Sequence, residues 1–431
     1  MKTLLILILS TALVKGEIIL YRAAAIHTAD QGTIENGKLL VNDGRIVAVG
    51  PEVASPDGAR EVDLGKLQVY PGLIAATTSL GLTEINAVRA TQDTSEAGDF
   101  SPDVEAWISV NPDSELIPVA RANGFTHALV APMGGTVTGA SGLIKTSGWG
   151  VEDMTVKPSV ALHIMWPALS INTTPKENMR NPDKYKTPKE QAKEREKKLR
   201  NIDRFFDDAE AYAKARKLKK EFNLIPAWEA TLNAVSRKQP IVVHANYERQ
   251  ITSAVNWAKK RNYKIIIAAG LDAWRVAELL AKEDVPVILD NVFRLPQRDT
   301  DPHDINFRSA GILHNAGVKV AHSVKMGNWG ATEIRNIIYA TARSMAYGLP
   351  PAPALRSITL HPAQMLGVDN RLGSLARGKE ATFIATDGDL FDIRSNVKRM
   401  WIAGKEVSLE SRHTRLYEKY HKRPMPNALK Q

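Results

Sequence analysis

Three histidines stand at or near the ends of short apolar runs, where their imidazoles could act together. His163 lies in "PSVALHIMW", His244 in "PIVVHANYE" and His322 in "VKVAHSVKMGN". Three ring nitrogens at one place are a set that binds a transition metal. An isolated histidine on a strand more often makes a structural hydrogen bond. Both interpretations stay open from the sequence.

Carboxylates suited to acid–base catalysis without a metal also follow apolar runs. The candidates are Glu84, Asp93, Glu96, Asp272 and Asp290. Lys325 could act as a base or form a Schiff base if desolvation lowers its pKa, or it could be an ordinary ion-pair partner. We take four residues as the catalytic candidates: His244, Lys325, Asp272 and Asp290.

A second group of residues could contact a ligand. Trp149, Trp166 and Trp329 fall in expected loops, where they would either stack on a ring or sugar or pack as core or lid residues. The glycine-rich segment 131–142, "APMGGTVTGASG", is not a phosphate loop and is expected to be a close-packed loop near the site. We predict these pocket-binding residues: Thr77, Ser79, Glu84, His163, Asn246, His322, Trp149 and Trp166.

The elements that must position these side chains alternate between apolar runs and helical patterns. The runs are 72–80, 125–131, 142–145, 159–165, 240–244, 264–269, 285–290 and 318–323. Helical patterns such as 249–261, 273–283 and 332–347 separate most of them. Strands alternating with helices indicate a parallel sheet. Eight of them predict an α/β fold, a (β/α)₈ TIM barrel over 71–365, with its chemistry at the carboxyl ends of the strands.

Both ends of the chain have β-rich character. Short β-branched runs lie before residue 71, and Asp43-Gly44 between two of them is a strong hairpin signal. Similar runs return at 381–385 and 397–402. We therefore predict a small composite β-sandwich formed by 17–70 together with 366–410, followed by a C-terminal tail, 411–431.

The first residues are typical of an export signal. Met1-Lys2 precedes an apolar run, 4–14, that is too short to span a bilayer, and Gly16 is a small residue at the expected cleavage site. We predict a signal peptide over 1–16 and a periplasmic or secreted protein. The chain has 0 cysteines, which suits an oxidising compartment. No later segment is long and apolar enough to predict a membrane span.

The net charge of +10 is concentrated in one segment. Residues 176–220 hold 16 Lys/Arg against 9 Asp/Glu, a surplus of 7, within a predicted basic helical insert over 176–222. Mixed charge on an amphipathic pattern usually indicates a solvated helix, and the alternative is a surface that docks on an anionic partner. Nucleic acid is not an expected partner of an exported protein.

The two ends of the chain carry a family resemblance. "IENGKLLVNDGRIVAVGPE" followed by "VYPGLI", and "LHPAQMLGVDNRLGSLARGKEATFIA" with "VKRMWIAGKEV", resemble the amidohydrolase superfamily. Within it they are similar to imidazolonepropionase-like and dihydroorotase-like enzymes. The resemblance implies a barrel with a composite β-sandwich, a divalent metal such as zinc, and hydrolysis of non-peptide carbon–nitrogen bonds.

The metal ligands that the resemblance implies are mostly replaced. Its His-x-His pair falls on Thr77 and Ser79, and its last-strand aspartate falls on Val324 or Lys325. The sixth run ends in Ala269-Gly270 where a histidine is expected, and His244 alone is retained. Neutral hydroxyls do not replace imidazoles as zinc ligands. We therefore predict a degraded metal site and no cofactor.

Three functions remain open at this stage. The first is an exported, non-catalytic homologue or subunit that binds a small-molecule or oligomeric ligand, either alone or in a homo- or hetero-oligomer with an active relative. The second is a hydrolase that cleaves an amide or glycoside without a metal or with a displaced one. The third is a scaffold that docks on an anionic partner through the basic helix, including Lys197, Lys198, Lys217, Lys219 and Lys220.

Overall fold

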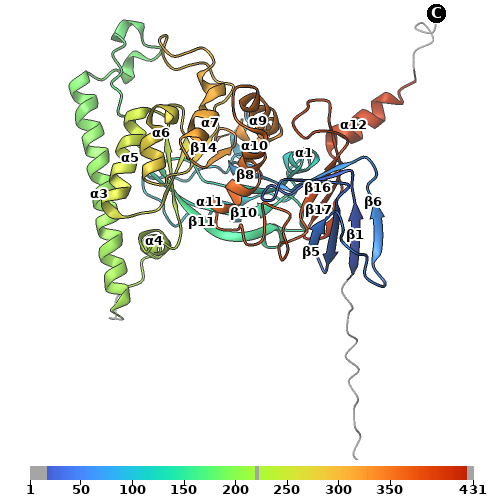
Figure 1. The fold of residues 1–431 in the computed structure, drawn as a ribbon. Coiled ribbons are helices and arrows are strands. Elements are labelled where there is room, and N and C mark those ends of the chain that lie inside the picture. The colour runs from blue at the N-terminus through green and yellow to red at the C-terminus, as the bar shows by residue number, and fades with distance from the viewer. Residues whose placement is uncertain (1–16, 219–222, 328, 425–431) are drawn as a thin grey trace, which may run out of the picture.

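The fold was obtained as a computed structural model, which describes residues 17–218, 223–327 and 329–424. The predicted signal peptide, Lys219, Lys220 and the last residues of the predicted tail therefore lie outside the described residues. A central barrel occupies the middle of the molecule, a β-sandwich stands at one side, and a long helix lies along the opposite side (Figure 1). The predicted fold class, a TIM barrel with a composite β domain, is confirmed.

The barrel is one eight-stranded sheet whose strands follow one another in chain order. The strands are β8 (Leu73–Thr78), β9 (Phe125–Val130), β10 (Val137–Lys145), β11 (Thr155–Met165), β12 (Ile241–Ala245), β13 (Ile265–Ala269), β14 (Val287–Leu289) and β15 (Val320–His322). No backbone ladder joins β8 to β15 in the described sheet. Side-chain hydrogen bonds bridge that seam instead, as described below.

One strand departs from the expected parallel arrangement. β10 runs antiparallel to both β9 and β11. The connection from Val130 to Val137 is a short turn, and a parallel crossover needs a dozen or more residues. The glycine-rich segment predicted as a loop supplies most of this strand, and a Cβ on Gly139 would lie 2.5 Å from the carbonyl oxygen of Val104. Glycine is required there because the 83–110 segment packs directly on the strand.

Helices cover the outside of the barrel. They are α1 (Leu116–Ala122), α2 (Val151–Met154), α3 (Pro188–Lys217), α4 (Pro226–Val235), α5 (Glu248–Arg261), α6 (Ala277–Lys282), α7 (Ile305–Asn315), α8 (Gly330–Glu333), α9 (Ile337–Ala346), α10 (Pro351–Ser357) and α11 (Leu360–Met365). A further helix, α12 (Arg412–His421), buries none of its residues and does not cover the barrel. Short 3₁₀ turns lie at η1 (Arg89–Thr91), η2 (Ala106–Ser109), η3 (Lys176–Asn178), η4 (Pro182–Lys184), η5 (Ala273–Val276) and η6 (Ile334–Asn336).

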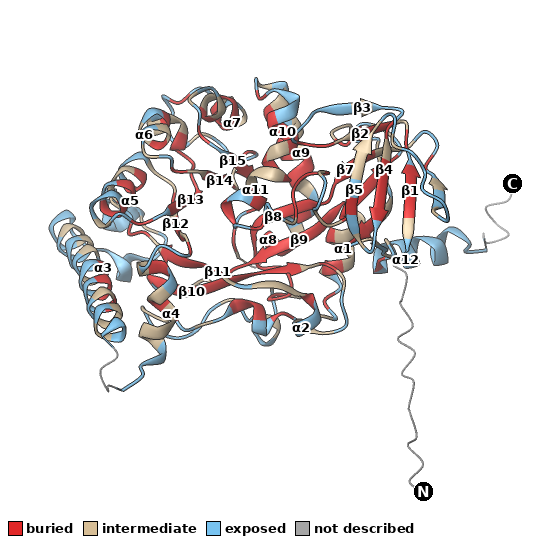
Figure 2. Cartoon of the chain, turned by 60° about the horizontal axis from the view of Figure 1, so that its bottom comes forward, coloured by how far each residue is buried: buried red, intermediate tan, exposed pale blue. Residues whose placement is uncertain are grey.

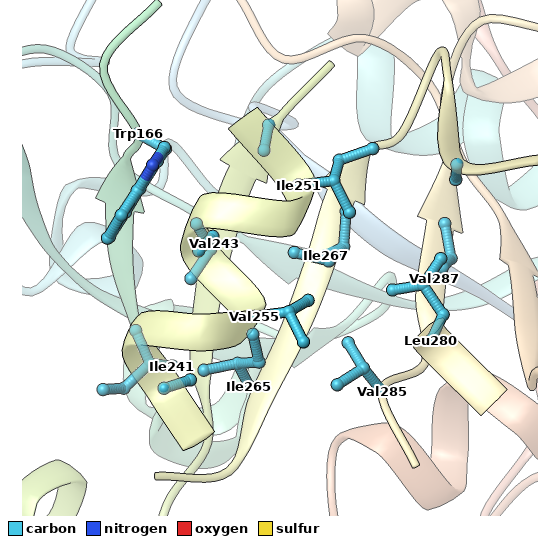
Figure 3. Close-up of a cluster of buried hydrophobic side chains, with 14 of the residues drawn as sticks. Trp166, Ile241, Val243, Ile251, Val255, Ile265, Ile267, Leu280, Val285 and Val287 are labelled. Carbon is cyan, nitrogen blue, oxygen red and sulfur yellow. The ribbon is translucent and has the colours of Figure 1, made fainter. Parts of the chain in front are cut away.

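The largest core lies between this helical layer and the outward faces of the strands. Ile251 and Val255 on α5 face the outward side chains of β12 and β13, among them Val243 and Ile267 (Figure 3). Alternate residues of a strand face opposite sides, so these positions leave the neighbouring residues of the same strands for the barrel interior. His244 therefore belongs to the interior face of β12.

The composite domain consists of two sheets built from both ends of the chain. One holds β1 (Ile18–Arg22), β4 (Lys38–Asn42), β5 (Arg45–Gly50) and β6 (Arg60–Asp63); the other holds β2 (Ala25–His27), β3 (Thr33–Glu35), β7 (Gln68–Pro71), β16 (Phe383–Thr386), β17 (Val397–Ile402) and β18 (Lys405–Glu406). Tyr21, Phe383 and Trp401 pack in their common core. The Asp43-Gly44 turn joins β4 to β5 with positive φ at both residues, as the sequence predicted.

Two helices expose most of their surface. α3 buries one stripe, Ile202, Phe205, Phe206 and Ala209, and exposes its charged side, whereas α12 buries none of its residues (Figure 2). Among the described residues, no helix has the length and apolar character that a membrane crossing requires.

Candidate functional site

A cavity of about 450 Å³ opens at the carboxyl ends of β13, β14 and β15. This is the end of a TIM barrel where ligands and substrates bind. It is lined by Asn246, Ala269, Asp290, Asn291, Val292, Phe293, Arg294, Ser323, Val324, Lys325, Glu333, Asn336, Ile337 and Ala340. Three residues predicted from the sequence, Asn246, Asp290 and Lys325, are thus brought together in one cavity.

Asp290 follows β14 and is partly buried at the cavity wall. Burial raises the pKa of its carboxyl to about 6, although the charges of Lys325 and Arg294 oppose the rise. The adjacent Asn291 anchors the backbone by donating a hydrogen bond from Nδ2 to the carbonyl of Ala269, at 2.7 Å. Asp290 is therefore a carboxyl group held on a fixed strand end that changes protonation near neutral pH.

Two cations and a second carboxylate complete the charged lining. Lys325 and Arg294 are both exposed at the cavity, and neither forms an ion pair with Asp290 within 4 Å among the described residues. Glu333 accepts a hydrogen bond from Nδ2 of Asn336. Lys325 is held in a tight turn, because a Cβ on Gly330 would overlap its carbonyl oxygen. The Lys325 side chain is exposed at the cavity and is available to an anionic group there.

The predicted histidines separate into a pair and an outlier. Nδ1 of His163 lies 3.0 Å from Nε2 of His244, at the ends of adjacent strands β11 and β12. Burial lowers the pKa of both rings, that of His244 to about 4, so both are neutral at pH 7 and one of the two facing nitrogens donates a hydrogen bond to the other. Nε2 of His163 is buried without a partner among the described residues.

His322 lies on the other face of β15. Its Nδ1 lies 2.8 Å from the hydroxyl of Ser357, and its Nε2 lies 3.0 Å from that of Ser344. Both ring nitrogens are therefore used by the helices outside the barrel. Adjacent residues of a strand face opposite sides of the sheet, and Ser323 faces the barrel interior. His322 therefore faces outward and reaches neither the cavity nor the other two histidines.

Thr77 and Ser79 do not present free hydroxyls to the cavity. Thr77 Oγ1 donates to the sulfur of Met326 at 2.8 Å, and Ser79 Oγ donates to the carbonyl of Gly327 at 2.6 Å. Both side chains are buried and tie the end of β8 to the segment after β15. The expected pair of ligand donors beside His244 is a structural tie across the seam of the barrel.

Asp272 belongs to a loop anchor rather than to the cavity lining. Its buried carboxylate accepts two hydrogen bonds from Arg298, at 3.0 and 2.7 Å. Arg275 pairs with Asp301 beside it. These ion pairs fix the 291–304 loop, which carries the cavity residues Phe293 and Arg294. Asp272 therefore acts on the cavity only through this loop.

The two tryptophans predicted in the pocket lie elsewhere. Trp149 is 95% exposed and follows β10. Because β10 runs antiparallel, its end lies at the face opposite the cavity, which the expectation of a parallel strand missed. Trp166 is buried in the outer core, with its ring centroid 5.2 Å from that of Trp257 (Figure 3). Its role is packing.

The polar loop after β8 contributes no residue to the cavity lining. Glu84 lies in this loop, and its Oε1 is buried without a partner among the described residues. Several residues of the cavity lining were not predicted from the sequence, notably Ser323, Phe293, Arg294 and Glu333. The positions of Ser323 and Arg294 just after predicted strands were available signals. The sequence held no such signal for Glu333, because this residue reaches the cavity from the helix α8 and not from the end of a strand.

A protein site for a transition metal normally needs three or more donor side chains placed close together. Within residues 17–218, 223–327 and 329–424, no group of three or more histidine, cysteine, aspartate or glutamate side chains is placed to hold one. The nearest arrangement of imidazoles is the His163–His244 pair, whose facing nitrogens already contact each other.

The chain matches the amidohydrolase family over residues 123–407, and it belongs to this family. An amidohydrolase structure from Thermotoga maritima superposes with a TM-score of 0.77 at 24% identity, covering 90% of this chain and 99% of that one.

Relatives of known name match shorter segments. N-acetylgalactosamine-6-phosphate deacetylase of Escherichia coli O157:H7 is 36% identical over 98 residues, 22% of this chain and 23% of that protein. Imidazolonepropionase of Acinetobacter baumannii (strain ATCC 17978) is 29% identical over 157 residues, 36% of this chain and 37% of that protein. The chain thus spans well under two thirds of the length of these relatives.

Proposed function

We propose that this protein is an exported member of the amidohydrolase family that binds a small anionic ligand in the cavity of Asp290 and Lys325, without the family's metal centre. The observation that carries the proposal is Lys325, a cation at the cavity; it and Val324 are the two positions on which the metal-binding aspartate implied by the family resemblance could fall. An ammonium group repels a divalent metal but attracts a carboxylate or phosphate.

The other positions support the same function. The resemblance implies histidines at Thr77 and Ser79, whose hydroxyl protons are donated to Met326 and Gly327. A hydroxyl so engaged is a poor zinc ligand. The residues present therefore do not fit the metal that the family implies, and no step of the proposed function uses one.

The ligand is expected to combine an anionic group with an apolar part. Lys325 and Arg294 offer the positive charge, Asn246 and Asn291 offer amide groups, and Val292, Phe293 and Ile337 offer apolar wall. A cavity of about 450 Å³ lies within the usual size of small-molecule sites. A compact organic acid or phosphate ester fits this lining.

Two lysines that flank the strand β15 at its opposite ends provide a matched test of the proposal. Lys325 follows β15 at the cavity, and the exposed Lys319 precedes the same strand at the opposite end of the barrel. Titration calorimetry against a panel of small carboxylates and phosphate esters should find a ligand whose affinity falls at least about tenfold in Lys325→Met and not in Lys319→Met. Stoichiometric zinc, manganese or iron in the purified protein would refute the metal-free site.

Metal-free hydrolysis is a second candidate, favoured by the raised pKa of Asp290. A carboxyl group with a pKa of about 6 is partly protonated near neutral pH and suits general acid–base catalysis. In this function Asp290 would take a proton from water as the water oxygen bonds to the amide carbon, and Lys325 would stabilise the developing oxyanion. The protonated Asp290 would then give the proton to the nitrogen as the carbon–nitrogen bond breaks. Release of amine from amide substrates that is lost in Asp290→Asn, in metal-free buffer, would establish it over simple binding.

Export is part of the proposal and has its own test. The apolar run at 4–14 supports a cleaved signal over 1–16. Mass spectrometry of the protein from a periplasmic or culture fraction should find a mature chain beginning near Glu17. Recovery of the uncut chain in the cytoplasm would contradict export.

A further inference from the structure

The C-terminal helix α12 presents an aromatic face that the described chain leaves largely exposed, although Leu416 at its edge is only 37% exposed. Leu416, Tyr417 and Tyr420 share about a third of the helix circumference, and the two tyrosines are 65% and 59% exposed. None of the ten residues of α12 is buried. The helix lies at the edge of the molecule, beside α1, and leads away from the compact part of the chain (Figure 1).

This helix is nevertheless specified by its sequence. Ser411 is buried and its hydroxyl accepts a hydrogen bond from the N–H of Thr414, forming a capping box at the first turn. Arg415 ties the helix to the body through Glu115, just before α1, at 3.5 Å. Arg415 is still 52% exposed in this ion pair, so the basic side chains of α12 and its aromatic face are both open to an approaching surface.

A ten-residue helix with no buried side chain lacks what normally stabilises one. Isolated helices shorter than about 12–15 residues are marginal in water, and most helical stability in proteins comes from packing an apolar face. The capping box and one exposed ion pair contribute little beside that. A surface that covers Leu416, Tyr417 and Tyr420 would supply the missing packing.

The charge of the segment decides which surface fits. From Glu410 to Arg423 there are 5 Lys/Arg and 2 Asp/Glu, a surplus of 3. Lys419 lies at the edge of the aromatic face, 5.4 Å from the ring centroid of Tyr420. A second copy of the same cationic helix would be repelled, whereas an anionic surface would be attracted.

We propose that α12 docks on an anionic lipid surface, with Leu416, Tyr417 and Tyr420 entering the headgroup region. Tyrosine rings are suited to such an interface because one end is apolar and the other is polar. Basic residues beside an apolar helix face strengthen binding to anionic lipid. This is a peripheral attachment and is independent of the ligand in the cavity.

Vesicle co-sedimentation of the full chain tests the proposal. The probes are vesicles of phosphatidylcholine alone and of equal parts phosphatidylglycerol and phosphatidylcholine. The variant Leu416→Ser/Tyr417→Ser/Tyr420→Ser should partition to the anionic vesicles at least about tenfold more weakly than the wild type. Because both chains contain residues 1–16, the difference between them reports α12 alone.

A matched triple variant controls for loss of exposed apolar surface. Ile171→Ser/Tyr185→Ser/Leu224→Ser removes similar exposed side chains beside the basic insert, away from α12, and should bind like the wild type. The proposal is overturned if the α12 variant binds anionic vesicles unchanged, if both triple variants lose binding equally, or if the wild type does not prefer anionic vesicles. It is also overturned if the α12 variant instead abolishes a dimer seen by light scattering.

Discussion

The hydroxyl of Ser323 bridges the backbone of Thr77 on both sides. It accepts a hydrogen bond from the Thr77 N–H at 3.1 Å and donates one to the Thr77 carbonyl at 2.7 Å. Thr77 and Ser323 belong to the ends of β8 and β15, the two strands that no ladder joins. A serine side chain therefore closes the barrel beside the cavity.

Replacing this serine should destabilise the protein markedly. Ser323→Ala leaves a buried N–H and a buried carbonyl of Thr77 without this partner, which costs about 1–3 kcal/mol for each unsatisfied group. Chemical denaturation should show the loss in the free energy of unfolding. Ser309→Ala is the matched control, because the Ser309 hydroxyl is buried without a partner in the described part of the chain. An equal effect of the two substitutions would contradict the bridging role.

The histidine pair should make the protein less stable in acid. Burial holds the pKa of His163 and of His244 below the ordinary value of 6.5, so the unfolded chain binds more protons between that value and the folded pKa. Stability from the neutral pair is present above about pH 6.5 and is lost as the pH falls toward 4. His163→Asn should flatten this dependence in urea melts from pH 4 to 7, whereas the exposed His413→Asn should leave it unchanged.

Asp290 should act in the opposite sense. Its folded pKa of about 6 exceeds the ordinary value of 3.8, so the native state binds the extra proton and stability falls as the pH rises through this range. Above pH 6, Asp290→Asn should therefore be more stable than the wild type, by about 1–2 kcal/mol once partial exposure is allowed for. The exposed Asp299→Asn serves as the control. A less stable Asp290→Asn protein at pH 8 would show that the charge is favourably paired.

Restoring two histidines should not restore a metal enzyme. In Thr77→His/Ser79→His, Lys325 still places a positive charge at the cavity and Ala269 still offers no ligand. Metal analysis after zinc exposure and dialysis should find less than one equivalent, as in the wild type treated alike. Stoichiometric zinc together with amide hydrolysis in this variant would refute the proposal that metal ligands are also missing outside the strand β8.

Much of the fold could be predicted because it rests on local patterns. The Asp43-Gly44 turn and the apolar runs each constrain a few neighbouring positions. The direction of β10 could not be predicted from its composition, since it depends on the length of the turn before Val137. That direction alone places Trp149 on the wrong face for ligand binding.

The site was less predictable because side-chain partners come from distant segments. Asp290, Lys325 and Asn246 could be placed at strand ends by counting, and the structure brings them together. The engagement of Asp272 by Arg298, of His322 by two serines and of Thr77 by Met326 depends on contacts across 22 to 249 residues of chain. Sequence spacing contains no information about such partners.

The reversal of β10 also makes the rim of the barrel unequal. On one side, β9, β10 and β11 form a continuous antiparallel ladder, and the segment after β8 is bridged to it. On the other side, the rim consists of the connections after β14 and β15, which carry most of the cavity lining. Natural selection would remove substitutions in the ladder, because they disrupt the fold. Substitutions in the two connections would change only which ligand is bound. Divergence among close homologues should therefore accumulate on one half of the rim, and a library for new ligand specificity is best confined to that half.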